Sequence, residues 1–189
     1  METTAEHILD AVERLVCIEG TRKLTIDAVA AEAGMSKGGV LYNFRSKHEL
    51  LLGVIRRVVS EVRERTYTLS DKLTEQGVAC PILRASFQIY KEYREKTAPK
   101  ALFALAAQEP ELIAEFQEMS AEFGRAINCE VSDPVTGHMC LLIIDGLYYR
   151  QALGIEQNST GEIDELIDRV LEITSQNNRY AELNAEAGN

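Results

Sequence analysis

The sequence predicts an all-α protein with about nine helices, because apolar residues recur every three or four positions along nearly the whole chain. Glycine, proline and capping residues punctuate this pattern, and no run alternates apolar and polar residues as a half-buried strand would. The chain has 189 residues, of which 46% are hydrophobic and 26% are charged. These values are typical of globular proteins with one or two domains and argue against disordered or fibrous architectures.

Three helices are expected close to the N-terminus. A capping box that begins at Thr3 opens the first helix, which ends near Gly20. The second helix begins after Thr25 and stops at Gly34, a residue type that ends helices in a left-handed turn. Ser36 is a suitable N-cap for the third helix. This N-terminal part is therefore predicted to be a compact three-helix unit.

The fourth predicted helix is longer than the first three. It begins at a capping box that starts with Ser46, and its apolar positions keep one stripe through residues 47–66. The segment 77–81 breaks the pattern, and a fifth helix follows it up to about residue 96. The fourth helix is thus expected to join the N-terminal unit to the rest of the chain.

The C-terminal half is predicted to be helical up to a polar tail. Proline suits the first turn of a helix and predicts three further helix starts, at Pro99, Pro110 and Pro134. The helix at 134–152 is the most apolar of the chain, and a last capping box at Ser159 precedes an amphipathic helix at 162–174. Residues 175–189 are polar and are expected to be frayed or disordered.

The net charge of −10 is unevenly distributed along the chain. Residues 1–65 contain ten basic and ten acidic residues, so the whole acidic excess lies in residues 66–189. Residues 20–60 contain seven basic residues against three acidic ones. A local basic segment suits phosphate contacts, whereas total charge acts mainly on solubility and long-range steering. The distribution therefore predicts two units with different roles.

The sequence lacks the signals of membrane, secreted, metal-binding and enzymatic proteins. The longest apolar run, Met139 to Ile144, is too short to cross a bilayer, and the N-terminus has no secretory pattern. Four scattered cysteines without a CxxC pair are expected to be reduced thiols of a cytoplasmic protein. A Gly-rich phosphate loop, a nucleophile elbow and an HExxH motif are all missing. We therefore expect no cofactor, no metal and no catalytic activity.

Residues 25–44 have the outline of a helix-turn-helix, in which the second helix enters the major groove of DNA. The residues that this second helix would offer first are Ser36, Lys37, Gly38 and Gly39. Two glycines within a helix cost about 1 kcal/mol each relative to alanine, so a compensating reason is needed. Close approach of the helix backbone to DNA would be such a reason.

Further residues around this helix are suited to DNA contacts. Tyr42 and Asn43, about one turn later, can reach a phosphate or a base edge. Thr25 and Lys47 each stand at a helix start, where free N–H groups and the helix dipole favour phosphate. The alternative interpretation is that the glycines end a turn and that the lysines are solvated surface charges.

The segment TIDAVAAEAGMSKGGVLYNFRSKHELL closely resembles the DNA-binding signature of the tetracycline-repressor (TetR-type) family of bacterial regulators. With the preceding ILDAVERLVCIEG helix, the resemblance covers about residues 4–64, and the spacing S-K-G-x-x-x-Y-x-F-x-S-K is specific. It implies an all-helical homodimer that has a helix-turn-helix unit and a variable C-terminal unit for ligand binding and dimerisation. The expected boundaries are 1–46 for the DNA-binding domain and 47–174 for the ligand-binding and dimerisation domain.

The resemblance also implies roles for individual residues. By motif position, three residues would contact phosphates: Thr25, Tyr42 and Lys47. Four residues would face the groove: Lys37, Gly38, Gly39 and Asn43. The family often has histidine or another aromatic residue where Asn43 stands, so this chain departs from the pattern there.

The helices at 134–152 and 162–174 are expected to form the dimer interface. The first is apolar around much of its circumference and must be covered on both sides. The resemblance makes the two helices half of a four-helix bundle with their two-fold mates, where Gly146 would permit close approach. Asp145 in the first helix is open to two interpretations, a ligand-binding carboxylate or a packing feature of the family.

A ligand pocket in this fold would lie among the helices of residues 50–150, with mostly apolar and aromatic walls. Eight residues are candidates by type and region: Phe87, Tyr90, Phe103, Phe116, Met119, Phe123, His138 and Tyr148. Each has the alternative of being an ordinary core residue. The acidic C-terminal unit is compatible with a cationic lipophilic ligand, but a solvated acidic surface explains it equally well.

The function expected from these features is that of a ligand-responsive transcriptional regulator. We expect a repressor that a small molecule releases from a palindromic or pseudo-palindromic double-stranded DNA operator. Ligand binding would shift the helix at 47–66 and change the separation of the two recognition helices, which a dimer must set about 34–36 Å apart. The alternative is a protein that keeps the helix-turn-helix fold but acts through protein–protein contacts without specific DNA binding.

Overall fold

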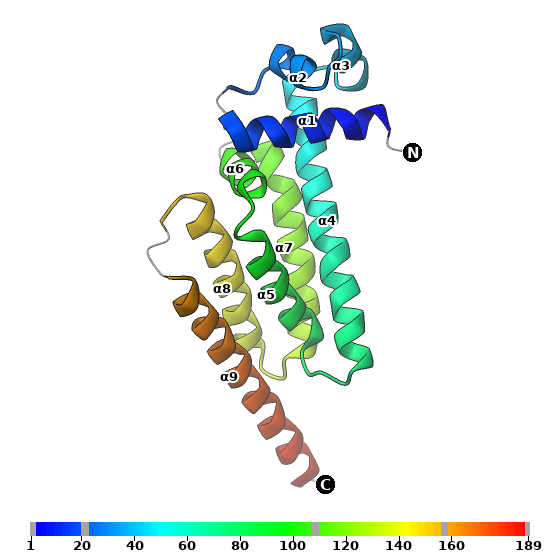
Figure 1. The fold of residues 1–189 in the computed structure, drawn as a ribbon. Coiled ribbons are helices and arrows are strands. Elements are labelled where there is room, and N and C mark those ends of the chain that lie inside the picture. The colour runs from blue at the N-terminus through cyan, green and yellow to red at the C-terminus, as the bar shows by residue number, and fades with distance from the viewer. Residues whose placement is uncertain (1–2, 20–22, 107–109, 156–158, 188–189) are drawn as a thin grey trace. The chain divides into compact units, whose positions relative to one another are not determined.

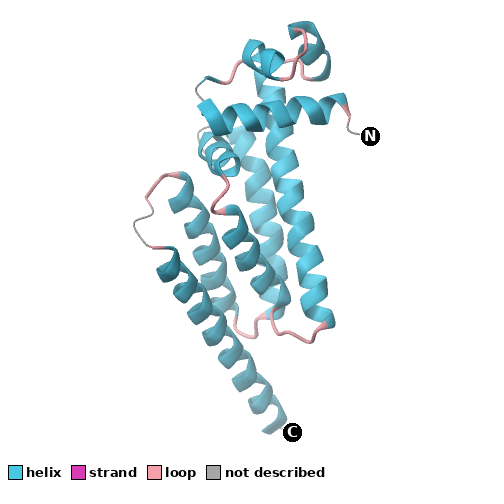
Figure 2. Ribbon diagram, viewed as in Figure 1, coloured by secondary structure: helices cyan, strands magenta, loops and turns pink. Residues whose placement is uncertain are grey.

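The computed structural model describes residues 3–19, 23–106, 110–155 and 159–187, and these residues form nine helices and no strand (Figures 1 and 2). In chain order the helices are α1 (Thr4–Glu19), α2 (Ile26–Glu32), α3 (Lys37–Asn43), α4 (Lys47–Glu75), α5 (Pro81–Tyr93), α6 (Thr97–Ala106), α7 (Pro110–Glu130), α8 (Pro134–Ala152) and α9 (Thr160–Ala187). The predicted all-α class is therefore confirmed. None of the described helices is long and apolar enough to cross a membrane.

The capping residues identified in the sequence do open helices. At α1, the Glu6 amide donates to Thr3 Oγ1 at 3.2 Å and the Thr3 amide donates to the Glu6 carboxylate at 2.6 Å. Ser159 and Glu162 form the same reciprocal pair before α9. Local side-chain acceptors thus satisfy amide groups that the first turn leaves without partners.

Two helices are longer than the sequence predicts. Helix α4 continues to Glu75, beyond the expected end near residue 66, and Gly77 follows it with a left-handed φ of 69°. Helix α9 continues to Ala187, through the segment expected to be frayed from residue 175. Long-range contacts of Asn177 and Asn178, the second described below, help to order the first part of this extension.

The chain forms two compact units, each made of two segments. The first unit comprises Met1–Glu61 and Glu95–Phe116, and the second comprises Val62–Arg94 and Gln117–Asn189. This division differs from the expected boundary between residues 46 and 47, because α4 contributes its first half to one unit and its second half to the other. In the first unit α6 packs against α1, so a segment distant in sequence supports the N-terminal helices.

The first unit has an apolar core that includes α1 and the start of α4. Ile8 and Val12 of α1 and Leu50 and Val54 of α4 are fully buried. At the edge of this core, Arg57 donates to Asp10 and to Glu13, at 2.6 Å each. Burial lowers the pKa of this guanidinium, but the two carboxylates more than offset this effect and raise it.

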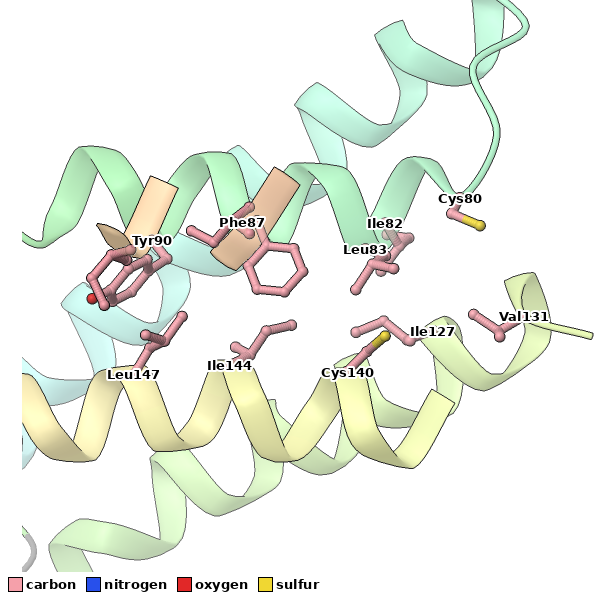
Figure 3. Packing of buried hydrophobic residues seen from close by; sticks show 12 residues of the cluster. Cys80, Ile82, Leu83, Phe87, Tyr90, Ile127, Val131, Cys140, Ile144 and Leu147 are labelled. Carbon is pink, nitrogen blue, oxygen red and sulfur yellow. The ribbon is translucent and has the colours of Figure 1, made fainter. Parts of the chain in front are cut away.

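The core of the second unit lies between α5, α7, α8 and α9. Leu83 and Phe87 of α5 face Cys140 and Ile144 of α8 across this cluster, and Ile127 of α7 lies between them (Figure 3). Helix α8 thus contributes one apolar face to the interior of the unit. Burial raises the pKa of the Cys140 thiol, which favours the uncharged form of a packed cysteine.

Asn178 of α9 connects three parts of the second unit. Its Nδ2 donates to the carbonyl of Glu130 at 2.9 Å and to Cys80 Sγ at 3.3 Å. Its Oδ1 accepts from both the amide and the hydroxyl of Ser132. Cys80 itself has a left-handed φ of 53°, a backbone conformation that non-glycine residues rarely adopt. These contacts hold the C-terminal half of α9 against the end of α7 and the starts of α5 and α8.

We predict that Asn178→Ala lowers the free energy of unfolding by about 1–3 kcal/mol, because it leaves partly buried hydrogen-bonding groups unsatisfied. Urea denaturation followed by circular dichroism measures this change. Gln176→Ala is the matched control, since Gln176 is exposed on the same helix and bonds only Glu172. Equal free energies of unfolding of the two variants would show that the Asn178 bonds do not stabilise the packing of α9.

Candidate nucleic-acid interface

Helices α2 and α3 pack against each other and are joined by a tight turn (Figure 1). Gly34 takes a φ of 63° in this turn, which a side chain would strain. The Met35 amide donates back to the carbonyl of Ala30 at 2.8 Å and closes the end of α2. Helix α1 contacts both helices from the same unit. The geometry is that of a helix-turn-helix, as the sequence predicts.

The hydroxyls of Thr25 and Ser36 serve as helix caps. Thr25 Oγ1 accepts from the amide of Ala28 at 3.1 Å, and Ser36 Oγ accepts from the amide of Gly39 at 3.1 Å. Both residues are exposed. Each cap therefore fixes the start of its helix and leaves the neighbouring amide groups of that first turn facing the surface.

Lys37 and Asp27 form an ion pair between α3 and α2, with 3.0 Å between Nζ and Oδ2. Both side chains are largely exposed, so solvent screens the pair and its contribution to stability is small. The pair holds the Lys37 ammonium at the first turn of α3 and places an acidic group beside it. Sequence analysis identified the lysine but not its partner.

Tyr42 and Asn43 stand at the end of α3 in different situations. The side chain of Tyr42 is 89% exposed, which is unusual for a large aromatic residue without a contact. The Asn43 amide group donates to the Gly39 carbonyl at 3.0 Å, one turn earlier on the same helix. Tyr42 is thus available to a partner, whereas Asn43 must exchange an internal hydrogen bond for any external one.

The two glycines of α3 differ in the space around them. A Cβ atom at Gly38 would meet only Ser36 Oγ, at 3.9 Å. At Gly39 it would meet the Met35 methyl group at 3.2 Å and the capping hydroxyl of Ser36 at 3.4 Å. Packing within the chain therefore gives a reason for glycine at position 39 but none at position 38.

The basic residues counted in residues 20–60 fall into two groups. Arg56 and Arg57 pair with carboxylates of their own unit, Arg56 with Glu115 at 2.7 Å. Four others are exposed around the helix-turn-helix: Lys23, Lys37, Arg45 and Lys47. Arg22 lies outside the described residues. Arg45, between α3 and α4, also belongs to the candidate surface. The motif does not include it, but the count of basic residues in 20–60 does.

The eight candidate pocket residues do not form one group. Phe87 and Tyr90 are buried in the cluster of Figure 3, against which Tyr148 packs. Met119 and Phe123 belong to a second cluster with Val62, Ile89 and Tyr93.

Three of these candidates lie elsewhere. Phe103 and Phe116 pack edge to face within the first unit, with 4.8 Å between their ring centroids. His138 is exposed, and its Nδ1 lies 2.9 Å from the Pro134 carbonyl of its own helix. Among the described residues, no three metal-ligating side chains gather at one point.

A stripe of exposed apolar side chains runs along α8. The exposed apolar residues are Val135, Met139, Leu142, Tyr149 and Leu153. Together with Gly146, which lies between Leu142 and Tyr149, they are spaced by alternating steps of four and three residues. A Cβ atom at Gly146 would meet nothing within 4 Å. Leu166 and Ile173 are similarly exposed on α9. This spacing presents one continuous face of a helix, as in coiled-coil packing.

Comparisons with known proteins match both parts of the chain. Residues 8–54 match the family described as bacterial regulatory proteins, tetR family. Residues 78–175, just over half of the 189 residues, match the tetracyclin repressor-like C-terminal domain. The HTH-type transcriptional regulator BetI of Rhizobium meliloti (strain 1021) is 26% identical over 155 residues, which cover 77% of this chain and 76% of BetI.

Solved structures share the fold at lower identity. A transcriptional regulator from Rhodococcus sp. Rha1 has a TM-score of 0.72 at 19% identity, covering 92% of this chain and 97% of the other. The multidrug binding protein EbrR, complexed with imidazole, has a TM-score of 0.66 at 20% identity, covering 89% and 94%. The helix-turn-helix geometry and the two family matches lead to one conclusion. The chain belongs to the TetR family of bacterial regulatory proteins and is a DNA-binding transcriptional regulator, not an enzyme.

Proposed function

We propose that this regulator is a homodimeric repressor that a small molecule releases from a palindromic operator. The observation that carries the DNA-binding part is the exposed end of the helix-turn-helix, where four basic side chains and an 89%-exposed tyrosine stand beside two helix starts. Cations and free amide groups are what phosphates require. We propose the cytoplasm as its place of action, where bacterial operator DNA is accessible.

Different residues of the surface take different roles in this proposal. The phosphate contacts are Thr25, through its exposed helix start, together with Tyr42 and Lys47. The first turn of α3, from Ser36 through Lys37 to Gly39, enters the major groove, with Gly38 as the point of closest approach. Asn43 exchanges its bond to the Gly39 carbonyl for a contact in the groove. Arg45 adds charge at the edge of the contact.

The second copy of the chain covers the apolar stripes of α8 and α9 in this proposal. Exposed apolar side chains at heptad spacing lose contact with water when an identical helix packs against them across a two-fold axis. The open space around Gly146 allows the two α8 helices to approach closely. The interface thus comprises the expected helices, residues 134–152 and 162–174.

Ligand response is proposed to act through α4, which contributes to both units. An effector must bind the released state more tightly than the DNA-bound state, because equal affinity shifts no equilibrium. EbrR is described as a multidrug binding protein, which supports a small-molecule effector here. The effector and the operator sequence are to be found by experiment.

A mobility-shift titration against the DNA flanking the gene tests the proposal, at two salt concentrations and with unlabelled competitor DNA. We expect competitor-resistant binding of one dimer that weakens as salt rises. Binding no tighter than to random DNA, both there and in genome-wide selection, would favour the alternative of a helix-turn-helix protein that acts through protein contacts.

We predict that Lys47→Ala weakens DNA binding and flattens its salt dependence. Each lost phosphate contact removes about 0.9 from the slope of log K against log salt, so a dimer loses about 1.8. Fluorescence anisotropy over a salt series measures the slope. Lys72→Ala is the matched control, because Lys72 is exposed near the other end of the same helix. Equal slopes for both variants would exclude Lys47 as a phosphate contact.

We predict that Gly38→Ala separates folding from DNA binding. Alanine favours the helix and meets no clash within the chain, so the free energy of unfolding should rise by up to about 1 kcal/mol. The new methyl group would stand where the helix backbone approaches DNA, so affinity should fall. Thermal denaturation and fluorescence anisotropy measure the two effects. Unchanged affinity would mean that the helix does not come close to DNA at this residue.

We predict that Leu142→Arg converts the dimer to a monomer and abolishes operator binding. Leu142 is 70% exposed in the middle of the α8 stripe, and the variant would bring like charges together in the dimer. Light scattering after size exclusion gives the mass. Ile18→Arg is the control, since Ile18 is 76% exposed on α1, away from the stripe. A dimeric Leu142→Arg variant would contradict the proposed interface.

A further inference from the structure

Asp145 of α8 is a half-buried carboxylate with a single hydrogen-bonding partner. Ser120 Oγ of α7 lies 3.0 and 3.1 Å from its two oxygens. A hydroxyl has one proton, so it can donate fully to only one of these oxygens at a time. Within the described part of the chain, no lysine, arginine or histidine forms an ion pair with Asp145. Its negative charge is therefore uncompensated.

Two other acids of this unit, one half-buried and one more exposed, have stronger partners than Asp145. Glu130 accepts from the amides of Ile82 and Leu83 at the start of α5. Asp164 accepts from both terminal nitrogens of the Arg94 guanidinium. Burial raises the pKa of both half-buried carboxyl groups, that of Glu130 against its two amide donors and that of Asp145 against the Ser120 bond, so the pKa alone does not distinguish them. Asp145 thus has one hydroxyl donor, whereas Glu130 has two amide donors and Asp164 has a guanidinium group.

Tyr148 lies near this carboxylate and in turn packs on Tyr90. Tyr148, one turn along α8, packs edge to face on Tyr90 of α5 with 5.2 Å between the ring centroids. Burial raises the pKa of the Tyr148 hydroxyl, and the nearby Tyr90, Tyr93 and Asp145 add to this effect. Tyr90 lies over Leu147, at the end of the cluster in Figure 3. The negative group and the tyrosine rings therefore share one region between α5, α7 and α8.

A carboxylate beside aromatic rings is suited to an organic cation. The carboxylate supplies the opposite charge, and the electron-rich faces of tyrosine rings attract cations such as quaternary ammonium groups. An anionic or strongly hydrated ligand would gain nothing there, because the surrounding side chains are apolar. A compact inorganic cation would need several oxygen ligands, and the described residues gather no such group.

We propose that Asp145, with Tyr148 and Tyr90, is the binding site for a lipophilic organic cation, which is the effector of this regulator. The inference rests on the proposed ligand-released function and names its ligand class. Ser120 holds the carboxylate in place. Binding of the cation supplies the counter-charge that Asp145 lacks within the chain.

The test uses two ions of the same shape and opposite charge, tetraphenylphosphonium and tetraphenylborate. Isothermal titration compares their binding to the full-length wild type, Asp145→Asn and Glu118→Gln. Glu118 is the matched control, because it is exposed on α7 and its variant loses the same charge. We expect the wild type to prefer the cation. Asp145→Asn should weaken cation binding by at least about tenfold, and Glu118→Gln by less than about twofold.

Thermal denaturation separates a binding carboxylate from a packing one. If Asp145 serves in binding, its uncompensated charge lowers the free energy of unfolding of the unliganded protein. The Asp145→Asn variant should then melt at the same temperature as the wild type or higher. As a packing residue it is needed with Ser120, so Asp145→Asn and Ser120→Ala should both melt lower. Lower melting temperatures of both variants would overturn the proposal. Equal binding of the two ions by the wild type would also overturn it, as would an equal loss of cation affinity in Asp145→Asn and Glu118→Gln.

The effector role has its own readout. Tetraphenylphosphonium should release DNA from the wild type and not from Asp145→Asn, at concentrations where Glu118→Gln responds normally. Specific DNA binding that no cation changes would overturn the effector role while the repressor function stands. Cation binding that depends on Asp145, in a protein without specific DNA binding, would keep the site and overturn the proposed function.

Discussion

Helix α8 carries apolar side chains around much of its circumference, and a single chain covers only part of them. Cys140, Ile144 and Leu147 face the core formed with α5, while Met139 and Leu142 remain exposed. Water disfavours such a face, so the helix is stable in this sequence only if something else covers it. The second copy proposed above would cover this exposed face of α8. In the proposed dimer, this packing would in turn set the distance between the two recognition helices.

Local sequence signals predicted most of the helix boundaries and the DNA-binding motif. Caps such as Ser36 and Thr25 act within three residues, and glycine at position 34 is required by one backbone angle, so neighbouring residues suffice to identify them. The helix-turn-helix is therefore the part of the structure that such local signals identify. Their DNA contacts remain predictions, because the motif gives positions and not bound partners.

Long-range contacts were beyond the reach of such signals. Arg57 counted as a candidate cation for DNA, but it pairs with acids 44 and 47 residues away along the chain. Asn178 belonged to a segment expected to be frayed, yet it bonds residues at three other helix ends. Periodicity also could not divide the eight aromatic, methionine and histidine candidates between two units. Each of these outcomes depends on which surfaces meet, and a single sequence does not specify that directly.

The distribution of charge bears on how an acidic chain can bind DNA. Residues 66–189 contain ten more acidic than basic residues, so DNA is repelled from most of this chain. The acids of the N-terminal unit pair largely with its own arginines, as Arg57 and Arg56 show, and leave Arg45 and Lys47 exposed beside α3. Repulsion elsewhere lowers non-specific binding, whereas the few basic contacts at the helix-turn-helix keep their attraction. An acidic protein can therefore bind DNA selectively through one small surface, because specificity depends on the difference between the two affinities.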